Sequence, residues 1–168
     1  MEAANFKYDH PHGTIYGYIG EHGLQCLALP QTGQSQGHIH FLHSAPNLTV
    51  GRTLYRALDN YFAGMQESFA RITLDLSNGT PFQQAVWLAA RKVPWGKTCS
   101  YGEVARAAGR PKAFRAAGAA LGANPVPIIV PCHRIIGANG RLTGFSGGHA
   151  WKETLLGLEG FKAEAMRW

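Results

Sequence analysis

Two stretches in the first half of the chain alternate between apolar and polar residues, as strands do. Residues 14–29 place tyrosine, isoleucine and leucine in partial alternation around a turn-like interruption at Gly20–Gly23, and this pattern predicts a hairpin. Residues 69–76 alternate again and predict another strand. Residues 30–51 are rich in Gln, Ser, His, Gly and Pro, which predicts a loop with one strand near 38–42.

One helical pattern lies between these strands. The segment Arg52–Ala63 carries leucine, tyrosine and phenylalanine at helical spacing, and Gly64 ends it. The first half therefore predicts a small sheet with one helix. The turn Ser77-Asn-Gly79 follows, and we place the domain boundary between residues 78 and 79.

From Thr80 onward the pattern is helical. Thr80 suits an N-cap with Pro81 at the first helical position, and the helix ends at Pro94. Ser100 and Glu103 have the spacing of a capping box and begin a second helix. The chain as a whole thus predicts an α+β protein of two domains.

Two short helices in this second half form a helix-turn-helix candidate. The helix that begins at Ser100 ends at Gly109, and residues 112–121 predict the next one. Farther on, Asn139-Gly140 between apolar residues is a strong hairpin signal, which suggests a wing after the two helices. A last helix is predicted over residues 150–158.

Charge divides the chain at the same place. The formal net charge is +6 over 168 residues. Residues 1–79 hold four basic and six acidic side chains, a net −2, whereas residues 80–168 hold 12 basic and four acidic ones, a net +8. A basic half favours nucleic acid or an anionic membrane as its partner. A solvated basic face is the alternative that composition alone leaves open.

The sequence shows no segment that would direct the protein to a membrane or out of the cytoplasm. No segment reaches the ~18 apolar residues of a membrane span, and the N-terminus lacks the basic and apolar regions of a signal peptide. An odd number of cysteines, Cys26, Cys99 and Cys132, then indicates free thiols in a reducing compartment. We therefore expect a cytoplasmic protein without a membrane partner.

The tetrapeptide Pro131-Cys-His-Arg134 is the strongest candidate for chemistry. A thiol becomes a strong nucleophile only as a thiolate, which a neighbouring imidazole or cation favours. Adjacent side chains seldom face one another, so we expect a water to link Cys132 to His133. For a lone Cys-His pair the alternative is a buried cysteine beside a surface histidine.

Further short motifs surround this tetrapeptide at regular intervals. They are Gly79-Thr-Pro-Phe-Gln83, Val86-Trp87, Ser100-Tyr-Gly102, Arg110-Pro-Lys112, Arg115-Ala116, Ala123-Asn-Pro125, Ile135-Ile-Gly137, Gly140-Arg-Leu-Thr-Gly144, Ser146-Gly-Gly148 and Leu158-Glu-Gly160. Together with the tetrapeptide, this series resembles the O6-alkylguanine-DNA alkyltransferases, also called methylated-DNA–protein-cysteine methyltransferases. The resemblance covers about half of the chain. The first half is only loosely similar, through Tyr61-Phe-Ala-Gly64 and Leu74-Asp-Leu76.

The resemblance implies a fold and a reaction. Residues 1–78 would form a sheet-plus-helix scaffold of ribonuclease H-like type, and residues 79–168 a mostly helical, winged helix-turn-helix domain that binds DNA and carries catalysis. The protein would repair DNA by direct reversal. It would flip O6-alkylguanine, and O4-alkylthymine as well, out of double-stranded DNA and transfer the alkyl group irreversibly to Cys132 in a single turnover. The family precedent implies a monomer that needs no cofactor.

The resemblance also assigns catalytic roles. His133 would draw the proton from Cys132 through a water, and Glu159 would hold the imidazole, as in a nucleophile–base–orienter triad. Tyr101 would donate a hydrogen bond to the guanine ring. Asn124 would hold the turn before the nucleophile loop. Without the resemblance, Asn124 could simply form an Asx turn, which is compatible with its implied role, and Tyr101 could be an aromatic residue that packs on a neighbour.

Other positions would bind the DNA. Ser146 and the main chain at Ile135 match positions that read the edge of the guanine, and Arg115 matches the arginine that enters the base stack. The same helix continues with three small residues, Ala116, Ala117 and Gly118. The resemblance interprets them as close docking in the minor groove. The alternatives are a phosphate contact for Arg115 and close helix packing for the small residues.

A few features remain outside this pattern. Phe114 stands where family members usually have a small residue, and Phe145 where many have tyrosine. Six histidines of the first half, with Cys26, could in principle bind zinc as some family members do, but they show no clear ligand pattern. Cys99 reads as a packing residue. Two other functions are alternatives: a DNA-binding protein that only flags lesions, which the presence of Cys132 argues against, and a Cys-His hydrolase, which the basic half fits poorly.

Overall fold

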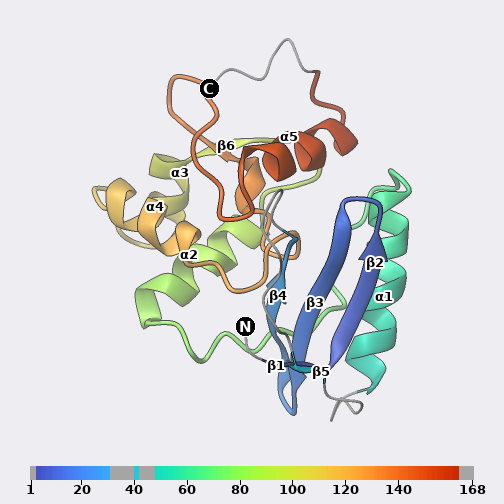
Figure 1. The fold of residues 1–168 in the computed structure, drawn as a ribbon. Helices are drawn as coiled ribbons and strands as arrows, with labels where there is room; N and C mark the ends of the chain where they lie inside the picture. Colours follow the sequence, from blue (N-terminus) through green and yellow to red (C-terminus); the bar gives the residue numbers. More distant parts are fainter. Residues whose placement is uncertain (1–2, 31–39, 42–47, 163–168) are drawn as a thin grey trace. The chain divides into compact units, whose positions relative to one another are not determined.

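An antiparallel sheet of three strands, in the order β2-β3-β4, forms the centre of the first part of the chain (Figure 1). The strands span Phe6–His10, Gly13–Gly20 and Gly23–Ala28. The computed structural model describes residues 3–30, 40–41 and 48–162. Strands β3 and β4 are the predicted hairpin, which is confirmed, with Gly20 opposite Gly23 at its turn.

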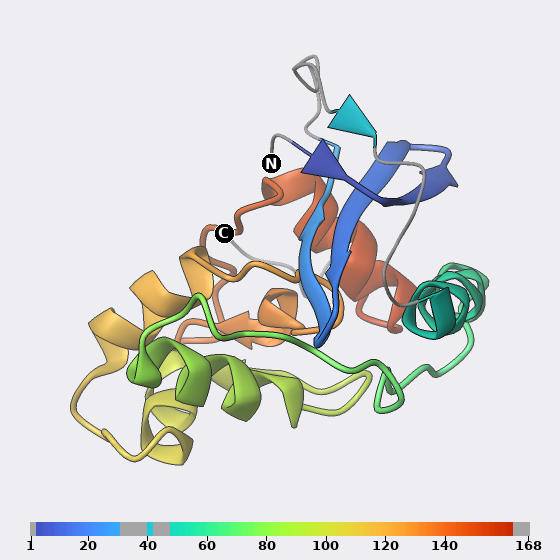
Figure 2. The ribbon, with the colours of Figure 1, turned by 90° about the horizontal axis from the view of Figure 1, so that it is seen from below.

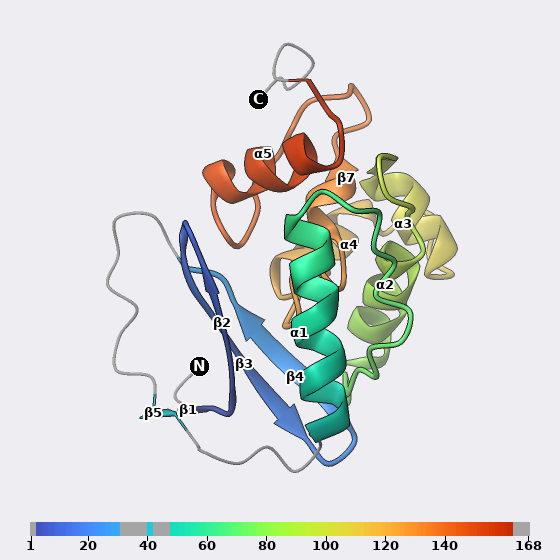
Figure 3. The ribbon, with the colours of Figure 1, turned by 90° about the vertical axis from the view of Figure 1, so that its right-hand side faces the viewer.

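Helix α1 (Leu48–Phe62) lies across this sheet (Figure 3). The predicted helix is thus confirmed, although it begins four residues before Arg52. Tyr8 of β2 packs against two aromatic rings of α1, with ring centroids 5.2 Å from Tyr55 and 5.7 Å from Phe62. The apolar side chains that the sheet and helix bury form a core for this half of the chain: Ile15, Ile19, Leu24, Leu54, Leu58 and Tyr61 are fully buried.

The predicted strand over residues 69–76 is wrong. Phe69 has a φ of 54°, and the backbone N–H of Ile72 donates to the carbonyl of Phe69 at 3.0 Å, so a turn opens the segment. Only Leu74 pairs, through one parallel bridge with Leu24 of β4. The turn interrupts the alternating residues before a ladder can form, although Ile72 and Leu76, which the alternation places on one face, are still buried.

A second small sheet joins two short strands in parallel. Strand β1 (Ala3–Ala4) pairs with β5 (His40–Phe41). The latter lies inside the strand predicted near residues 38–42, and the other residues of that prediction lie outside the described part of the chain. The chain divides into two compact units, Met1–Leu76 and Ser77–Trp168, so the division falls two residues before our predicted boundary.

Three helices of the second unit pack together: α2 (Pro81–Arg91), α3 (Tyr101–Ala107) and α4 (Phe114–Gly122), seen in green and yellow in Figure 2. The side chain of Thr80 accepts a hydrogen bond from the backbone of Gln83, whose own side chain accepts one from the backbone of Thr80, and this capping box begins α2. The indole N–H of Trp87 donates to the carbonyl of Ala120 at 2.7 Å and fixes α2 against α4.

The predicted start and end of α3 are also confirmed. Ser100 and Glu103 form the expected capping box. At the other end Gly109 has a φ of 79°, a left-handed conformation that favours glycine, and it turns the chain toward α4. Helix α4 begins at Phe114, two residues later than predicted, because the N–H of Ala113 donates to the carbonyl of Arg110 in a turn.

The hairpin predicted around Asn139-Gly140 is not a pair of strands. The turn itself forms, since the N–H of Gly137 donates to the carbonyl of Arg141 at 2.8 Å. Strand β7 (Ile135–Ile136), however, pairs in parallel with β6 (Cys99–Ser100). The carbonyl of Thr143, beyond the turn, instead accepts a hydrogen bond from the side chain of Lys152 in helix α5 (His149–Leu158).

Candidate active site

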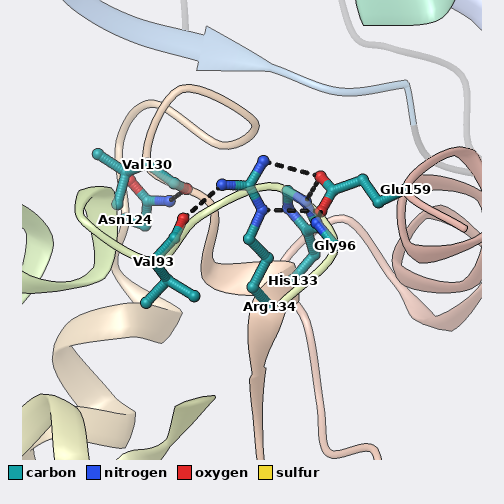
Figure 4. Close-up of polar contacts among 7 residues, drawn as sticks. All are labelled: Val93, Gly96, Asn124, Val130, His133, Arg134 and Glu159. Carbon is teal, nitrogen blue, oxygen red and sulfur yellow. Dashed lines mark hydrogen bonds and ion pairs between the residues drawn. The ribbon is translucent and has the colours of Figure 1, made fainter. Parts of the chain in front are cut away.

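A buried loop carries the chain from α4 to Cys132, and the side chain of Asn124 ties this loop together. Its Oδ1 atom accepts from the N–H of Val126 at 3.0 Å, and its Nδ2 atom donates to the carbonyl of Val130 at 2.9 Å (Figure 4). The same Nδ2 atom lies 3.0 Å from Sγ of Cys132. Asn124 therefore sets both the shape of the loop and the position of the sulfur.

The loop holds one strained residue. Ile128 has a φ of 73°, which a β-branched side chain rarely adopts, and it is fully buried. The N–H of Val130 donates to the carbonyl of Val126 at 3.0 Å and closes the loop around it. Strain of this kind persists only when its surroundings over-determine the backbone, and here it lies in the loop that leads to the candidate nucleophile.

His133, Arg134 and Glu159 form a buried network of polar and charged side chains (Figure 4). Nε2 of His133 lies 2.8 Å from Oε1 of Glu159. Nε and Nη2 of Arg134 donate to Oε2 and Oε1 of the same carboxylate at 2.8 and 2.9 Å. Arg134 also donates through Nη1 to the carbonyl of Val93 at 2.6 Å, and the N–H of Gly96 donates to Oε2 at 3.3 Å.

These contacts fix the charge of the carboxylate and the role of each imidazole nitrogen. Burial raises the pKa of Glu159, but the hydrogen bonds from His133 and Arg134 outweigh it and lower the pKa to about 2. An ionised carboxylate only accepts hydrogen bonds, so Nε2 of His133 carries the proton and Nδ1 is the basic nitrogen. Burial lowers the pKa of His133 against the opposing effect of Glu159, so the imidazole is neutral at neutral pH.

The thiol of Cys132 is protonated at rest. Burial raises its pKa to about 11, while the hydrogen bond from Asn124 and the charge of Lys152 act in the opposite direction. The sequence suggested that neighbouring groups would lower this pKa, and that expectation is wrong because the side chain is removed from water. A reaction at this sulfur therefore needs a base.

Lys152 is a buried cation that the sequence did not reveal. Its Nζ atom donates to the carbonyls of Ile135 at 2.8 Å and Thr143 at 3.1 Å, and its side chain is fully buried. Burial lowers its pKa to about 8. In the sequence it looks like an ordinary charged residue of a helix, and no spacing sets it apart. Arg134 belongs to the tetrapeptide, but nothing there indicated its contact with Glu159.

A small cavity lies beside the sulfur. Its volume is about 180 Å³, and Tyr101, Gly118, Leu121, Gly122, Cys132, Gly144, Phe145 and Ser146 line it. The hydroxyl of Tyr101 lies 2.5 Å from Oγ1 of Thr143. The ring of Phe145 stands edge-on to that of His133, with centroids 6.3 Å apart. The arrangement is a protonated thiol, with a tethered base next to it in the chain, facing a cavity of limited size.

The structure brings most of the predicted site residues together, but not all of them. Tyr101, Gly118, Ser146 and Cys132 share the cavity, and Asn124, His133 and Glu159 support it as described above. Arg115 and Ala116 are exposed on α4 and do not line the cavity. Ala117 is fully buried, so its side chain is not part of the exposed face of α4. Ile135 is also fully buried, and its carbonyl is already bound to Lys152.

Two findings concern metals and membranes. Among residues 3–30, 40–41 and 48–162, no three His, Cys, Asp or Glu side chains are grouped so that they could hold a metal ion. His38 and His43, which belong to the histidines considered for zinc, lie outside the described residues. In this same part of the chain, none of the helices has the length and apolar character needed to span a bilayer.

Comparisons with known proteins agree with this site. Residues 81–161 match the family model of the 6-O-methylguanine DNA methyltransferase DNA-binding domain. A methylated-DNA–protein-cysteine methyltransferase of Haemophilus influenzae is 42% identical over 143 residues, which are 79% of each chain. One from Methanosarcina acetivorans is 52% identical over 110 residues, 65% of this chain and 69% of that protein.

Solved structures extend the likeness to nearly the whole chain. The crystal structure of Mycobacterium tuberculosis OGT in complex with DNA shares 40% identity with a TM-score of 0.76, covering 98% of this chain and 95% of that one. Fold and site thus define a DNA-binding methyltransferase that acts in DNA repair. The chain belongs to the family of methylated-DNA–protein-cysteine methyltransferases, and its activity is methyl transfer from DNA to a protein cysteine.

Proposed function

We propose that the protein repairs O6-alkylguanine in double-stranded DNA by moving the alkyl group irreversibly to Sγ of its own Cys132. The observation that carries this proposal is the pairing of a small cavity with a buried thiol, whose neighbour in the chain is a histidine held by an ionised glutamate. No group in this arrangement regenerates the thiol. Each chain therefore acts once.

The proton of the thiol has a defined destination. With Nε2 of His133 engaged by Glu159, the proton passes from Sγ to Nδ1, through a water as the sequence suggested. The imidazolium that forms is stabilised by the carboxylate 2.8 Å away. The sulfur then attacks the alkyl carbon in line, the bond from that carbon to O6 breaks, and the electron pair stays on the guanine.

The leaving guanine needs a donor, and Tyr101 supplies it. Its hydroxyl lines the same cavity as Cys132 and is already hydrogen-bonded to Thr143. Donation to the guanine ring neutralises the charge that develops as the carbon–oxygen bond breaks. Ser146, which also lines the cavity, reads the edge of the guanine. O4-alkylthymine presents a similar alkylated oxygen and is the second substrate.

The position of the sulfur requires the base to leave the duplex. Cys132 is only 6% exposed, so an alkyl group stacked inside DNA cannot reach it, and the nucleotide must be flipped into the cavity. Helices α3 and α4 are the helix-turn-helix, and the turn at residues 137–141 is its wing. Arg115 and Ala116 on the exposed face of α4, with Gly118 beside them, dock in the minor groove, and Arg115 fills the space that the base leaves.

The first unit serves as a scaffold of ribonuclease H-like type, and the protein acts as a monomer without a cofactor. The strongly basic second half binds DNA of any sequence through its phosphates. Weak sequence preference suits a protein whose substrate can occur anywhere in the genome.

A labelled-transfer titration tests the proposal. DNA that carries O6-[³H]methylguanine should pass its label to protein up to one equivalent per chain and then stop, with the label on Cys132 in the digested protein. Cys132→Ala should bind the same duplex but take no label. Cys99→Ala removes another thiol of the same unit, half-buried, and should transfer normally. Continued turnover, or label on the Cys132→Ala protein, would contradict the proposal.

A further inference from the structure

All three arginines of the mildly acidic first half line one cavity. Arg52, Arg56 and Arg71 surround a volume of about 310 Å³ that is formed by residues of the first unit alone. The other basic residue of this half is Lys7, whose Nζ atom is paired with Asp9 at 3.2 Å. The positive charge of the first half is therefore concentrated at one place.

The geometry of this cavity is that of a cup with an apolar floor. Arg52 and Arg56 are four residues apart on α1, so their side chains share one face of the helix, and Asn60 follows on the same face. Arg71 comes from the segment beyond the helix. The floor consists of residues that the core of the unit buries, namely Ala57, Phe69 and Ile72.

The three guanidinium groups are not neutralised by carboxylates. Across the described residues, no ion pair within 4.0 Å includes any of them. Asp59, the acidic residue of α1, is hydrogen-bonded to Tyr8 instead. Two like charges four residues apart destabilise a helix, so this arrangement does not serve the stability of the helix.

One carboxylate also faces the cavity, and its position is fixed. Oε1 of Glu67 accepts from the N–H of Phe69 at 2.9 Å, and Oε2 accepts from the side chain of Asn60 at 3.4 Å. The lining therefore combines three positive groups and one negative group, with a net charge of +2. A hydroxyl group of a ligand could donate to this carboxylate while an anionic group of the same ligand meets the arginines.

We propose that this cavity, the arginine pocket, binds the phosphate group of a nucleotide. Arginine presents its donors in a planar fork that matches two phosphate oxygens at once. Glu67 accepts from a sugar hydroxyl, and the apolar floor receives the sugar and base. The volume lies at the lower end of the range of small-molecule sites, which suits one nucleotide. The nucleotide is either free, with a sugar hydroxyl for Glu67, or part of a DNA strand, and the phosphate that the arginines bind is common to both.

Calorimetric titration of the full-length protein with inorganic phosphate and with dGMP tests the pocket itself. Wild type should bind both probes, dGMP more tightly. Arg56→Gln and Arg71→Gln should each weaken dGMP binding about tenfold, the loss expected for one charge-assisted hydrogen bond. Lys7→Gln removes one positive charge from the same unit outside the pocket and should change the affinity less than twofold. Glu67→Gln removes the negative charge and should increase the affinity for inorganic phosphate, which damage to the fold could not do.

A second titration, with undamaged duplex DNA at several salt concentrations, shows whether the ligand is a free nucleotide or part of a DNA strand. If a DNA strand supplies the phosphate, Arg56→Gln and Arg71→Gln each reduce the slope of log affinity against log salt by about 0.9, and Lys7→Gln does not. If free nucleotides are the ligand, the slopes stay equal while dGMP affinity falls. The pocket is ruled out if both arginine variants bind dGMP, phosphate and DNA as wild type does. Because neither titration involves alkyl transfer, this result is independent of the proposed reaction at Cys132.

Discussion

The guanidinium of Arg134 binds the carboxylate of Glu159 in a bidentate manner, donating from Nε to Oε2 at 2.8 Å and from Nη2 to Oε1 at 2.9 Å. Because these bonds hold both oxygens, Oε1 stays within reach of His133. Arg134 thus acts on the base through Glu159, as a positioning residue.

Arg134→Lys keeps the charge but loses the paired geometry. We expect the free energy of unfolding to fall by about 2 kcal/mol, because a buried ammonium cannot satisfy both carboxylate oxygens. Single-turnover transfer should also slow, since the carboxylate no longer holds the imidazole firmly. Urea unfolding and rapid-quench transfer measure the two effects. Arg106→Lys, at an exposed position of α3, is the control, and an Arg134→Lys protein as stable as that control would contradict the prediction.

The stability of the protein in acid should depend on Glu159. Its pKa in the folded state is about 2, below its ordinary value of 4.5, so its contribution is complete above about pH 4.5 and is lost as the pH falls toward 2. The size of this contribution is about 3 kcal/mol, from 1.36 kcal/mol for each pKa unit. Urea unfolding of wild type and Glu159→Gln from pH 7 to pH 3 should show a stability difference that narrows below pH 4.5. A difference that stays constant over this range would show that folding does not lower the pKa of this carboxyl group.

The thiol of Cys132 should titrate near pH 11, with burial as the main cause. Mass-spectrometric measurement of its iodoacetamide labelling between pH 7 and pH 11 gives the pKa at this residue alone. Asn124→Leu removes the hydrogen-bond donor that lowers this pKa and should shift it upward, whereas Lys97→Met, at an exposed lysine of the same unit, should not. A Cys132 pKa at or below its ordinary value of 9 would contradict the expected effect of burial.

The hydroxyl of Tyr101 should matter more than its hydrogen bond to Thr143. Tyr101→Phe removes the donor to the guanine and should slow single-turnover transfer about 10- to 100-fold, because proton donation by one group contributes at least this much. Thr143→Val leaves the tyrosine donor in place and should slow transfer less than threefold. Rapid-quench kinetics on the same methylated duplex compare them. Equal slowing by both variants would assign the effect to the hydrogen bond rather than to donation.

Local signals predicted the elements whose ends are specified by neighbouring residues. The starts of α2 and α3 are examples, because the free N–H groups of each start are satisfied by residues within one turn: Thr80 with Pro81 begins α2, and Ser100 with Glu103 begins α3. Both starts could therefore be predicted from the local sequence. Strand pairing is different, because β7 finds its partner at Cys99–Ser100, far earlier in the chain. The Asn139-Gly140 signal correctly predicted a turn but could not reveal that partner.

The candidate site divides in the same way. Cys132 and His133 are visible as adjacent residues, and the resemblance supplied Glu159 and Asn124. The contacts of Arg134 and Lys152 could not be seen, because burial of a charge depends on partners that are distant in sequence. The arginine pocket shares this cause, since Arg71 reaches Arg52 and Arg56 only through the fold.

The side-chain amide of Asn124 donates two hydrogen bonds, one to the carbonyl of Val130 and one to the sulfur of Cys132. In the proposed reaction that sulfur becomes a thioether, and its added alkyl group crowds the amide of Asn124, which lies 3.0 Å from the sulfur. The loop that contains the strained Ile128 must then shift to make room, so we expect the alkylated protein to be less stable than the unreacted one. Each repair event would therefore leave behind a protein that unfolds more readily than it did before the reaction.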